Sequence, residues 1–211
     1  MNSALLLIDL QNDFCPGGAL AVAEGDAVIS VANQAMAFCR RSGFPVAASL
    51  DWHPRQHGSF AVNAGARVGD TGMLDGLSQV WWPVHCVQDT PGAQLHPQLH
   101  QQWIDKKILK GRQPEIDSYS AFFDNGHRQQ TELDDWLRAL DITHLTVMGL
   151  ATDYCVKFTV LDALSLGYRT DVLTEGCRGV NLDAGDSQRA LEEMRRHGAR
   201  LVTLDEMMRG V

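Results

Sequence analysis

The stretch HLTVMGLATDYCVKFTVLDALSLG, residues 144–167, decides the fold. Its first six residues, 144–149, are mostly apolar, which is typical of a strand that is buried on both faces of a sheet. From residue 153 onwards apolar side chains recur at helical spacing, and Gly167 ends the run. A short buried strand that leads directly into a helix is the repeating unit of a parallel sheet.

The same order of strand and helix recurs on both sides of this stretch. The expected strands cover residues 4–9, 45–50, 106–109, 144–149, 168–173 and 199–204, and the expected helices cover residues 24–42, 131–140, 153–167 and 187–197. We therefore expect an α/β fold with an open, doubly wound parallel sheet and helices on both faces, in a Rossmann-like arrangement of three layers. One domain over residues 1–211 suits a chain of this length.

The composition argues against several classes of protein. Of the 211 residues, 45% are hydrophobic, so the chain can bury a substantial core. It carries 18 basic and 26 acidic residues, a net charge of −8, whereas nucleic-acid binders usually present a basic surface. Its apolar runs are far shorter than the ~20 residues that span a bilayer, and no signal-peptide pattern opens the sequence. We expect a cytoplasmic monomer or homo-oligomer without nucleic-acid or membrane partners.

Five cysteines lie far apart in the sequence, at positions 15, 39, 86, 155 and 177. An odd number of widely spaced cysteines is typical of free thiols in a reducing compartment rather than of a disulfide framework.

The expected strand ends carry reactive side chains. Doubly wound sheets bind their ligands beyond the carboxyl ends of the strands, close to the point where the winding reverses. In this sequence those ends carry Asp9, Asp51, Lys110 and the turn that contains Cys155. Two acids, a lysine and a thiol are a reactive set of groups rather than a set that packs a core.

Cys155 is the candidate nucleophile. It lies in the first turn of its helix if Thr152 or Asp153 is the N-cap, and the partial positive charge there favours the nucleophilic thiolate. The main-chain N–H groups of Ala151 and Cys155 could stabilise an oxyanion at the same turn. Alternatively Cys155 only fills space, since free cysteines are often buried.

Asp9 and Lys110 could complete a cysteine hydrolase. A carboxylate beside the sulfur can take the thiol proton and later activate water, and an ammonium group steadies both anions. Taken alone, Asp9 is also compatible with a turn residue and Lys110 with a solvated surface lysine.

Metal-ligand side chains gather in the segment after the second strand. Asp51 and His53 stand two residues apart and point the same way in an extended chain. His57 and His85 follow in the same long segment. One acid with two histidines suits Zn²⁺, Fe²⁺ or Mn²⁺, although a lone histidine is more often a hydrogen-bonding residue.

Aromatic side chains lie next to these candidates in the sequence. Several aromatics beside a polar site can hold a flat ring between them, although most aromatic residues belong to a core. The residues concerned are Phe14, Trp52, Trp81, Trp82, Tyr119 and Tyr154.

Six short motifs stand out along the chain. They are LIDLQNDF at residues 7–14, DWHP at 51–54, WPVHCV at 82–87, KG at 110–111, DSYSAF at 117–122 and GLATDYCV at 149–156. In order and approximate spacing they resemble the nicotinamidases among the isochorismatase-like cysteine hydrolases, over nearly the whole chain. The resemblance implies a fold of the open α/β type described above.

The resemblance also implies a role for each matching residue. Asp9, Lys110 and Cys155 would be the catalytic residues, and the N–H groups of Ala151 and Cys155 would form the oxyanion hole. The family carries a cis peptide bond before this turn, which corresponds here to the bond between Leu150 and Ala151.

The implied cofactor is one divalent metal ion, with Zn²⁺ expected before Fe²⁺ or Mn²⁺. Asp51, His53 and His85 would be its ligands, and His57 would support them without binding the metal. The implied ring pocket is lined by Phe14, Trp82, Tyr119 and Tyr154.

The implied activity is the hydrolysis of nicotinamide to nicotinate and ammonia through a thioester on Cys155, in NAD salvage. Pyrazinamide would be a further substrate. Three alternatives stay open: an amidase for another small amide such as a carbamoyl or ureido compound, a metal-dependent sensor of pyridine ligands without turnover, and a hydrolase in which metal-bound water attacks directly.

Overall fold

A computed structural model describes residues 2–209 of the chain, and six of its strands form one parallel sheet. They are β1 (Ser3–Ile8), β2 (Val46–Asp51), β5 (Lys106–Lys110), β6 (His144–Leu150), β7 (Arg169–Arg178) and β8 (Arg200–Val202). Their order across the sheet is β5-β2-β1-β6-β7-β8, and every neighbouring pair runs parallel.

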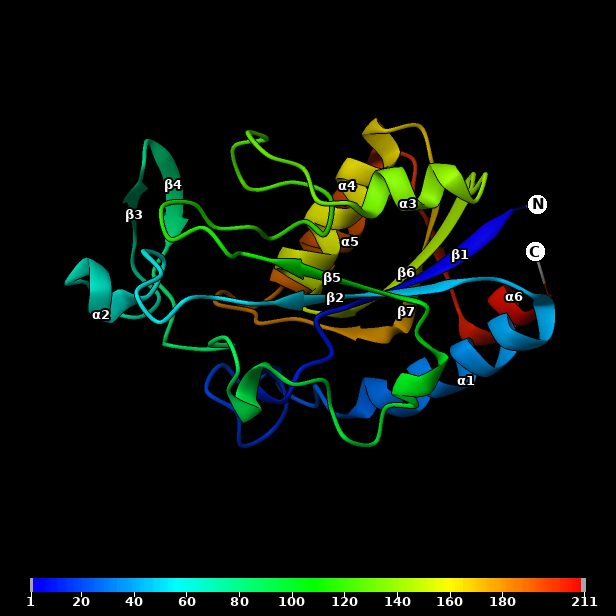
Figure 1. Ribbon diagram of the computed structural model, residues 1–211, viewed down its shortest axis with the longest axis horizontal. Coiled ribbons are helices and arrows are strands. Elements are labelled where there is room, and N and C mark those ends of the chain that lie inside the picture. The colour runs from blue at the N-terminus through cyan, green and yellow to red at the C-terminus, as the bar shows by residue number, and fades with distance from the viewer. Residues whose placement is uncertain (1, 210–211) are drawn as a thin grey trace.

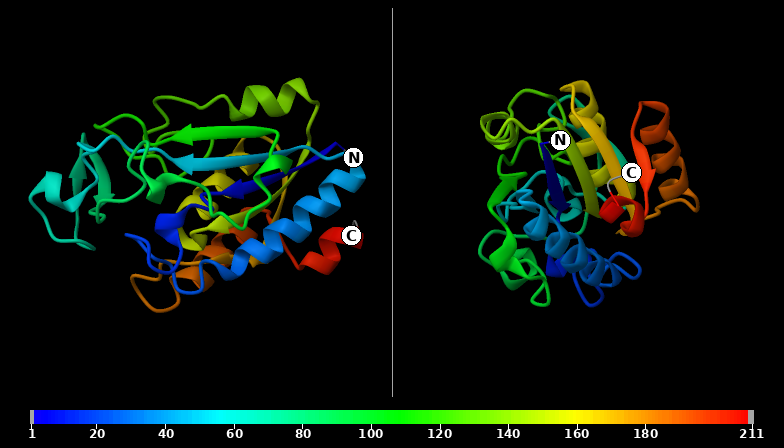
Figure 2. Two further views of the ribbon diagram at one scale, coloured as in Figure 1. Left: turned by 60° about the horizontal axis from the view of Figure 1, so that its bottom comes forward. Right: turned by 90° about the vertical axis from the view of Figure 1, so that its right-hand side faces the viewer.

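Helices cover both faces of the sheet (Figure 1). On one face lie α1 (Ala27–Ser42) and α6 (Leu204–Arg209), and on the other lie α3 (Leu133–Ala139), α4 (Lys157–Ser165) and α5 (Asp186–Arg196). The end-on view in Figure 2 shows the sheet between these two layers. This arrangement confirms the expected open parallel sheet in three layers.

Strand β1 lies in the middle of the core. Its residues Leu5, Leu6, Leu7 and Ile8 are each at most 1% exposed, because helices cover both faces of the sheet at this strand. Its neighbours are β2 on one side and β6 on the other. An unbroken apolar run without polar alternation is what such a strand requires.

The winding of the sheet reverses between β1 and β6. From β1 the chain adds β2 and β5 on one side, and it then returns to add β6, β7 and β8 on the other. The two strands approach closely there, because a Cβ atom on Gly149 would lie 2.1 Å from the carbonyl oxygen of Ile8. The carboxyl ends of β1 and β6 therefore border the crevice in which this class of sheet binds its ligands.

The segment between β2 and β5 contains local structure that the apolar pattern did not predict. An antiparallel hairpin of β3 (Thr71–Leu74) and β4 (Leu77–Val80) extends away from the sheet, next to the short helix α2 (Ala61–Ala64) (Figure 1). Short 3-10 helices also form at Asn12–Phe14, Pro91–Ala93 and Gln101–Trp103.

The chain after β6 also departs from the expected helix. Residues Thr152–Val156 form one wide π-helical turn, and α4 begins only at Lys157. The peptide bond between Leu150 and Ala151 is cis, as the resemblance implied. Strand β7 continues to Arg178, beyond the expected end at residue 173, and its pairing with β6 changes register between Val147 and Gly149.

None of the helices in residues 2–209 combines the length and the apolar character that crossing a membrane requires.

Candidate active site

The thiol of Cys155 lies in the π turn that follows β6. The turn begins after Ala151, in extended conformation, and no side chain caps it. The expectation that Thr152 or Asp153 is the N-cap is therefore wrong, because the wide turn directs the Asp153 side chain away from the helix start. The carbonyl oxygen of Ala151 instead accepts the N–H groups of Tyr154 and Val156, each at 3.1 Å, which anchors the turn.

Lys110 ends β5 and reaches the thiol from the side of the sheet. Its Nζ atom lies 3.4 Å from Cys155 Sγ and 2.9 Å from Asp9 Oδ2. It also donates to Asp51 Oδ1 at 2.5 Å and to the carbonyl oxygen of Ser118 at 2.9 Å. The lysine is 2% exposed, so the alternative of a solvated surface lysine is wrong.

Asp9 follows β1 directly and is fully buried beside this lysine. Ser49 on the neighbouring strand donates its hydroxyl to Asp9 Oδ1 at 2.6 Å. The second oxygen, Oδ2, accepts no hydrogen bond within the described part of the chain, although Lys110 Nζ lies beside it. Asp9 thus keeps one oxygen available for a proton.

Burial and charge shift the protonation of these three groups. Burial raises the pKa of the Cys155 thiol well above its usual value, although Lys110 opposes this shift. Burial also raises the pKa of Asp9. For Lys110 burial favours the neutral form, but the carboxylates of Asp51 and Asp9 outweigh it and hold the pKa well above the usual range. Burial thus favours the protonated thiol, and the two carboxylates favour the charged lysine.

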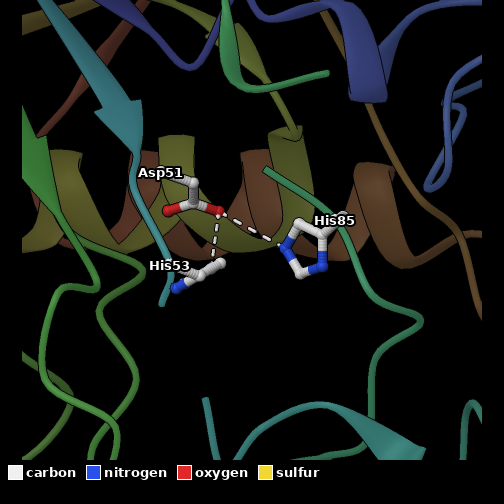
Figure 3. A group of neighbouring side chains, drawn as sticks. All are labelled: Asp51, His53 and His85. Carbon is white, nitrogen blue, oxygen red and sulfur yellow. Dashed lines mark ion pairs between the residues drawn. The ribbon is translucent and has the colours of Figure 1, made fainter. Parts of the chain in front are cut away.

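Asp51, His53 and His85 form a second buried group beside the first (Figure 3). Asp51 Oδ2 lies 3.4 Å from His53 Nε2 and 3.6 Å from His85 Nε2. In a tetrahedral zinc site with metal–ligand bonds of ~2.0–2.1 Å, neighbouring ligand atoms lie about 3.4 Å apart. The spacing of these three atoms therefore fits a metal ion.

The hydrogen bonds of the two histidines engage their Nδ1 atoms and leave their Nε2 atoms to bind a metal. His53 Nδ1 donates to the carbonyl oxygen of Gly111, and His85 Nδ1 donates to that of Pro83, both at 2.8 Å. Each Nε2 atom then carries a lone pair directed toward Asp51. His53 Nε2 is buried and has no hydrogen-bond partner among residues 2–209, and a metal ion would satisfy this atom.

The charge of the site also favours a cation. The buried carboxylates of Asp9 and Asp51 both face the ammonium group of Lys110, which can neutralise only one of them. Uncompensated charge is costly in a buried site, and a divalent cation would compensate it. We conclude that Asp51, His53 and His85 could hold a divalent metal ion.

Both ring nitrogens of His57 are occupied by protein groups. Nδ1 accepts the main-chain N–H of Ser59 at 3.2 Å and lies 2.7 Å from its hydroxyl, and Nε2 donates to the carbonyl oxygen of Ile116 at 3.3 Å. Burial, with the nearby His53, lowers the pKa of His57 to about 4. His57 packs on the His53 ring with centroids 4.3 Å apart, so a neutral His57 supports the side chain of this candidate ligand.

A small cavity of about 20 Å³ lies in front of Cys155. The four aromatic residues expected around a ring all border it: Phe14, Trp82, Tyr119 and Tyr154. Trp52 and Trp81 do not. A cavity of this size holds about one water molecule, so the positions of its walls decide how much space lies in front of the thiol.

Other residues at the site were not assigned a function from the sequence. Leu20, Asp117 and Val180 border the cavity as well. The side-chain amide of Gln11 accepts the N–H of Asp51 at 2.9 Å and donates to its carbonyl oxygen at 2.7 Å, which holds the backbone of this candidate ligand. Gln11 and Asp117 both lie within the quoted motifs, whereas Leu20 and Val180 lie outside them.

Comparisons with known proteins cover nearly the whole chain. The isochorismatase domain family matches residues 3–206. The chain is 61% identical over 201 residues to the nicotinamidase of Escherichia coli, covering 95% of this chain and 94% of that protein.

Two solved structures resemble this fold closely. A nicotinamidase and pyrazinamidase of Acinetobacter baumanii superposes with a TM-score of 0.92 at 40% identity, covering 98% of each chain. A pyrazinamidase of Pyrococcus horikoshii in complex with zinc superposes with a TM-score of 0.80 at 35% identity, covering 96% of this chain and 99% of that one.

Proposed function

Since this chain belongs to the isochorismatase family, we infer that it is a nicotinamidase, an amide hydrolase that converts nicotinamide to nicotinate and ammonia. Pyrazinamide, which has the same carboxamide on a similar ring, is a second substrate. The observation that carries the proposal is the position of Lys110, which contacts the thiol of Cys155, the carboxylate of Asp9 and the candidate metal ligand Asp51.

The first half of the proposed reaction forms a thioester. Asp9 takes the proton of the Cys155 thiol, and the sulfur attacks the carbonyl carbon of the carboxamide. The carbonyl oxygen becomes an oxyanion, which accepts hydrogen bonds from the N–H groups of Ala151 and Cys155. Asp9 then returns its proton to the amide nitrogen, the carbon–nitrogen bond breaks, and ammonia leaves.

The second half releases the acid. Asp9, again a carboxylate, takes a proton from a water molecule, whose oxygen attacks the thioester carbon. The carbon–sulfur bond breaks, the sulfur recovers a proton from Asp9, and the acid leaves and loses its own proton to water as nicotinate. Lys110 stays charged throughout, because its raised pKa keeps the ammonium group beside each anion as it forms.

The residues of the second group would hold Zn²⁺, and the P. horikoshii relative solved in complex with zinc supports this choice over Fe²⁺ and Mn²⁺. When bound, the ion supplies a Lewis acid for the ring nitrogen of the substrate, which fixes the ring relative to the thiol. The chain itself supplies the walls for the ring, from Phe14, Trp82, Tyr119 and Tyr154.

Ammonia release from nicotinamide by purified, zinc-loaded protein tests the proposal. We expect turnover by the wild type and a loss of at least about a thousandfold in Cys155→Ala, because a covalent mechanism needs its nucleophile. Cys39→Ala, which removes another buried thiol far from the cavity, is the matched control and should keep the activity.

Three outcomes would contradict the proposal. If the wild type binds pyridine ligands but releases no ammonia, the protein is a sensor. If it hydrolyses carbamoyl or ureido compounds and leaves nicotinamide intact, the substrate is wrong. Full activity in Cys155→Ala would exclude the thioester and favour direct attack by metal-bound water.

A further inference from the structure

Asp153 lies in the turn that carries Cys155, but the mechanism above does not use it. Its side chain is buried, and its carboxylate accepts two consecutive main-chain N–H groups from a distant segment. Oδ1 accepts the N–H of Val180 at 2.9 Å, and Oδ2 accepts that of Asn181 at 2.8 Å. Hydrogen bonds to an ionised acceptor are stronger than those between neutral groups, so this contact holds the segment firmly.

The segment held in this way is part of the cavity wall. Val180 follows β7 and borders the cavity together with Tyr154 and Cys155. Asn181 has a positive φ of 53°, and its side-chain oxygen accepts the N–H of Ser187 at the start of α5, at 2.9 Å. The wall is thus fixed to α5 at one point and to the turn of the nucleophile at another.

The small volume of the cavity makes the position of this wall important. The cavity holds about one water molecule, so a displacement of its wall changes a large part of the space in front of Cys155. A displacement of about 1 Å in a positioning group can lower a rate or an affinity by up to a hundredfold. The position of Val180 depends directly on the two hydrogen bonds to Asp153.

We propose that Asp153 is a positioning residue, which holds Val180 against the substrate ring and fixes this wall relative to the turn of Cys155. The effect on substrate rests on the proposed function, whereas the effect on access to the thiol does not. The carboxylate acts through Val180 and touches neither the reacting atoms nor the three candidate metal ligands.

The first test is steady-state kinetics of Asp153→Asn with nicotinamide. Asparagine keeps the shape of the side chain but places an NH₂ group opposite one of the two main-chain donors. We expect KM to rise about tenfold and kcat to change less than about threefold, with an unchanged pH profile. Asp186→Asn is the matched control, because that carboxylate accepts the N–H of Asp183 in the same loop without touching the wall.

A double-mutant cycle with Val180→Ala tests whether Asp153 acts through this side chain. Val180→Ala alone should also raise KM, and adding Asp153→Asn should raise it no further. If the two effects on KM multiply, or if Asp153→Asn lowers kcat at constant KM, the proposal is overturned. Because Val180 is partly exposed, its alanine variant tests the proposal even if Asp153→Asn does not fold.

A third measurement does not depend on the identity of the substrate. Iodoacetamide alkylates exposed thiols, and peptide mass spectrometry reports the rate at Cys155. We expect alkylation of Cys155 to be about tenfold faster in Asp153→Asn and in Val180→Ala than in the wild type or Asp186→Asn. Equal rates in all four proteins would overturn the proposal. Faster alkylation without nicotinamide turnover in the wild type would instead reject the proposed function alone.

Discussion

Lys110 and Asp51 form a buried ion pair, with Nζ 2.5 Å from Oδ1, that joins the group around the thiol to the candidate metal group. The pair also changes the carboxylate. Burial alone would raise the pKa of Asp51, but Lys110 and His53 outweigh it and hold the pKa well below its usual range. Asp51 therefore stays ionised, as a metal ligand must be.

Removing the lysine should damage stability and activity together. Lys110→Ala leaves Asp9 and Asp51 buried without their cation, and breaking a buried pair in this way costs about 3–5 kcal/mol. We expect urea unfolding at pH 7 to report a loss of that size and ammonia release to fall at least about a hundredfold. Lys107→Ala, an exposed lysine on the same strand, should change neither value and is the control.

Asp9 should set the acid side of the pH profile. The proposed base must be ionised, and burial raises its pKa, so activity is lost as the pH falls through this raised value. We expect the midpoint of kcat/KM to lie above the ordinary aspartate value of about 3.9. Asp9→Asn should lower kcat/KM by about a hundredfold or more and remove this acid limb. A midpoint at or below pH 4 in the wild type would contradict the prediction.

Gly111 should be essential for the position of His53. Its φ of +66° suits glycine, and an added Cβ would lie 2.4 Å from Cε1 of the His53 ring. We expect Gly111→Ala to lower the amount of zinc bound per protein, measured by atomic emission after dialysis. Gly43→Ala is the matched control, because Gly43 has a similar φ of +71° and open space around its Cβ position. Both variants should lose about 1 kcal/mol or more of stability. Equal zinc content in the two variants would show that the added Cβ at Gly111 does not displace the His53 ring.

The two histidines His85 and His57 should differ in their effect on metal binding. His85→Ala removes a candidate ligand, so we expect it to lose stoichiometric zinc. His57→Ala removes only a neighbour of His53. Residues that contact a metal ligand typically change the metal affinity by 10–100-fold, so this variant should bind zinc more weakly but in the same amount per protein. Competition with a chromogenic chelator measures both affinities. Loss of all zinc in His57→Ala would make His57 a ligand.

Asp171 should stabilise the fold in a pH-dependent way, far from the active site. Burial opposes its ionisation, but hydrogen bonds from Arg200 and His144 lower the pKa to about 2. A lowered pKa stabilises the fold above the unfolded value of about 3.9, and this contribution is lost as the pH falls toward 2. We expect Asp171→Asn to reduce the free energy of unfolding by about 1–2 kcal/mol at pH 7 and by about half as much at pH 3.

The control for this prediction is Asp205→Asn. Asp205 pairs with Arg209 on the surface, with both side chains largely exposed, and such pairs contribute little. If the free energies of unfolding of wild type and Asp171→Asn differ by the same amount from pH 7 to pH 3, the lowered pKa of Asp171 is contradicted.

The strands of the sheet could be predicted because each is a short apolar run that ends abruptly. Ser3–Ile8 and His144–Leu150 lie within one residue of the expected bounds, since burial on both faces leaves little room for polar residues. The strand ends then brought Asp9, Lys110 and Cys155 together, because parallel strands end at one edge.

The hairpin of β3 and β4 was missed although its turn carries a clear signal. Asp75 and Gly76 connect the strands with φ values of 46° and 82°, and Asp-Gly is a preferred pair for such a turn. The strands themselves are four residues long and partly exposed, so they show no long apolar pattern. A period-two pattern of this length is too short to identify a strand without the turn.

The capping of the turn was predicted wrongly for a tertiary reason. Asp153 is a suitable N-cap by its chemistry, but its carboxylate binds the N–H groups of Val180 and Asn181, which lie 27 and 28 positions away in sequence. Local propensity does not contain such contacts. Leu20 and Val180 were not predicted to border the cavity for the same reason, since single aliphatic residues in loops carry no local signal of function.

The strand order has a consequence for how new activities could arise on this scaffold. Lys110 and Asp51 end β5 and β2, Asp9 follows β1 directly and Cys155 lies in the turn after β6, so each of four adjacent strands supplies one residue. Adjacent strands lie about 4.8 Å apart because their hydrogen bonds set that distance. The backbone of the sheet therefore fixes the spacing of the reactive groups. The β3–β4 hairpin lies outside this set of strands and reaches the cavity only through a neighbour, because Gln79 donates to the hydroxyl of Tyr119, which borders the cavity, at 3.3 Å. Exchanging that hairpin between relatives should therefore alter which amides are accepted while the chemistry of bond cleavage is inherited unchanged.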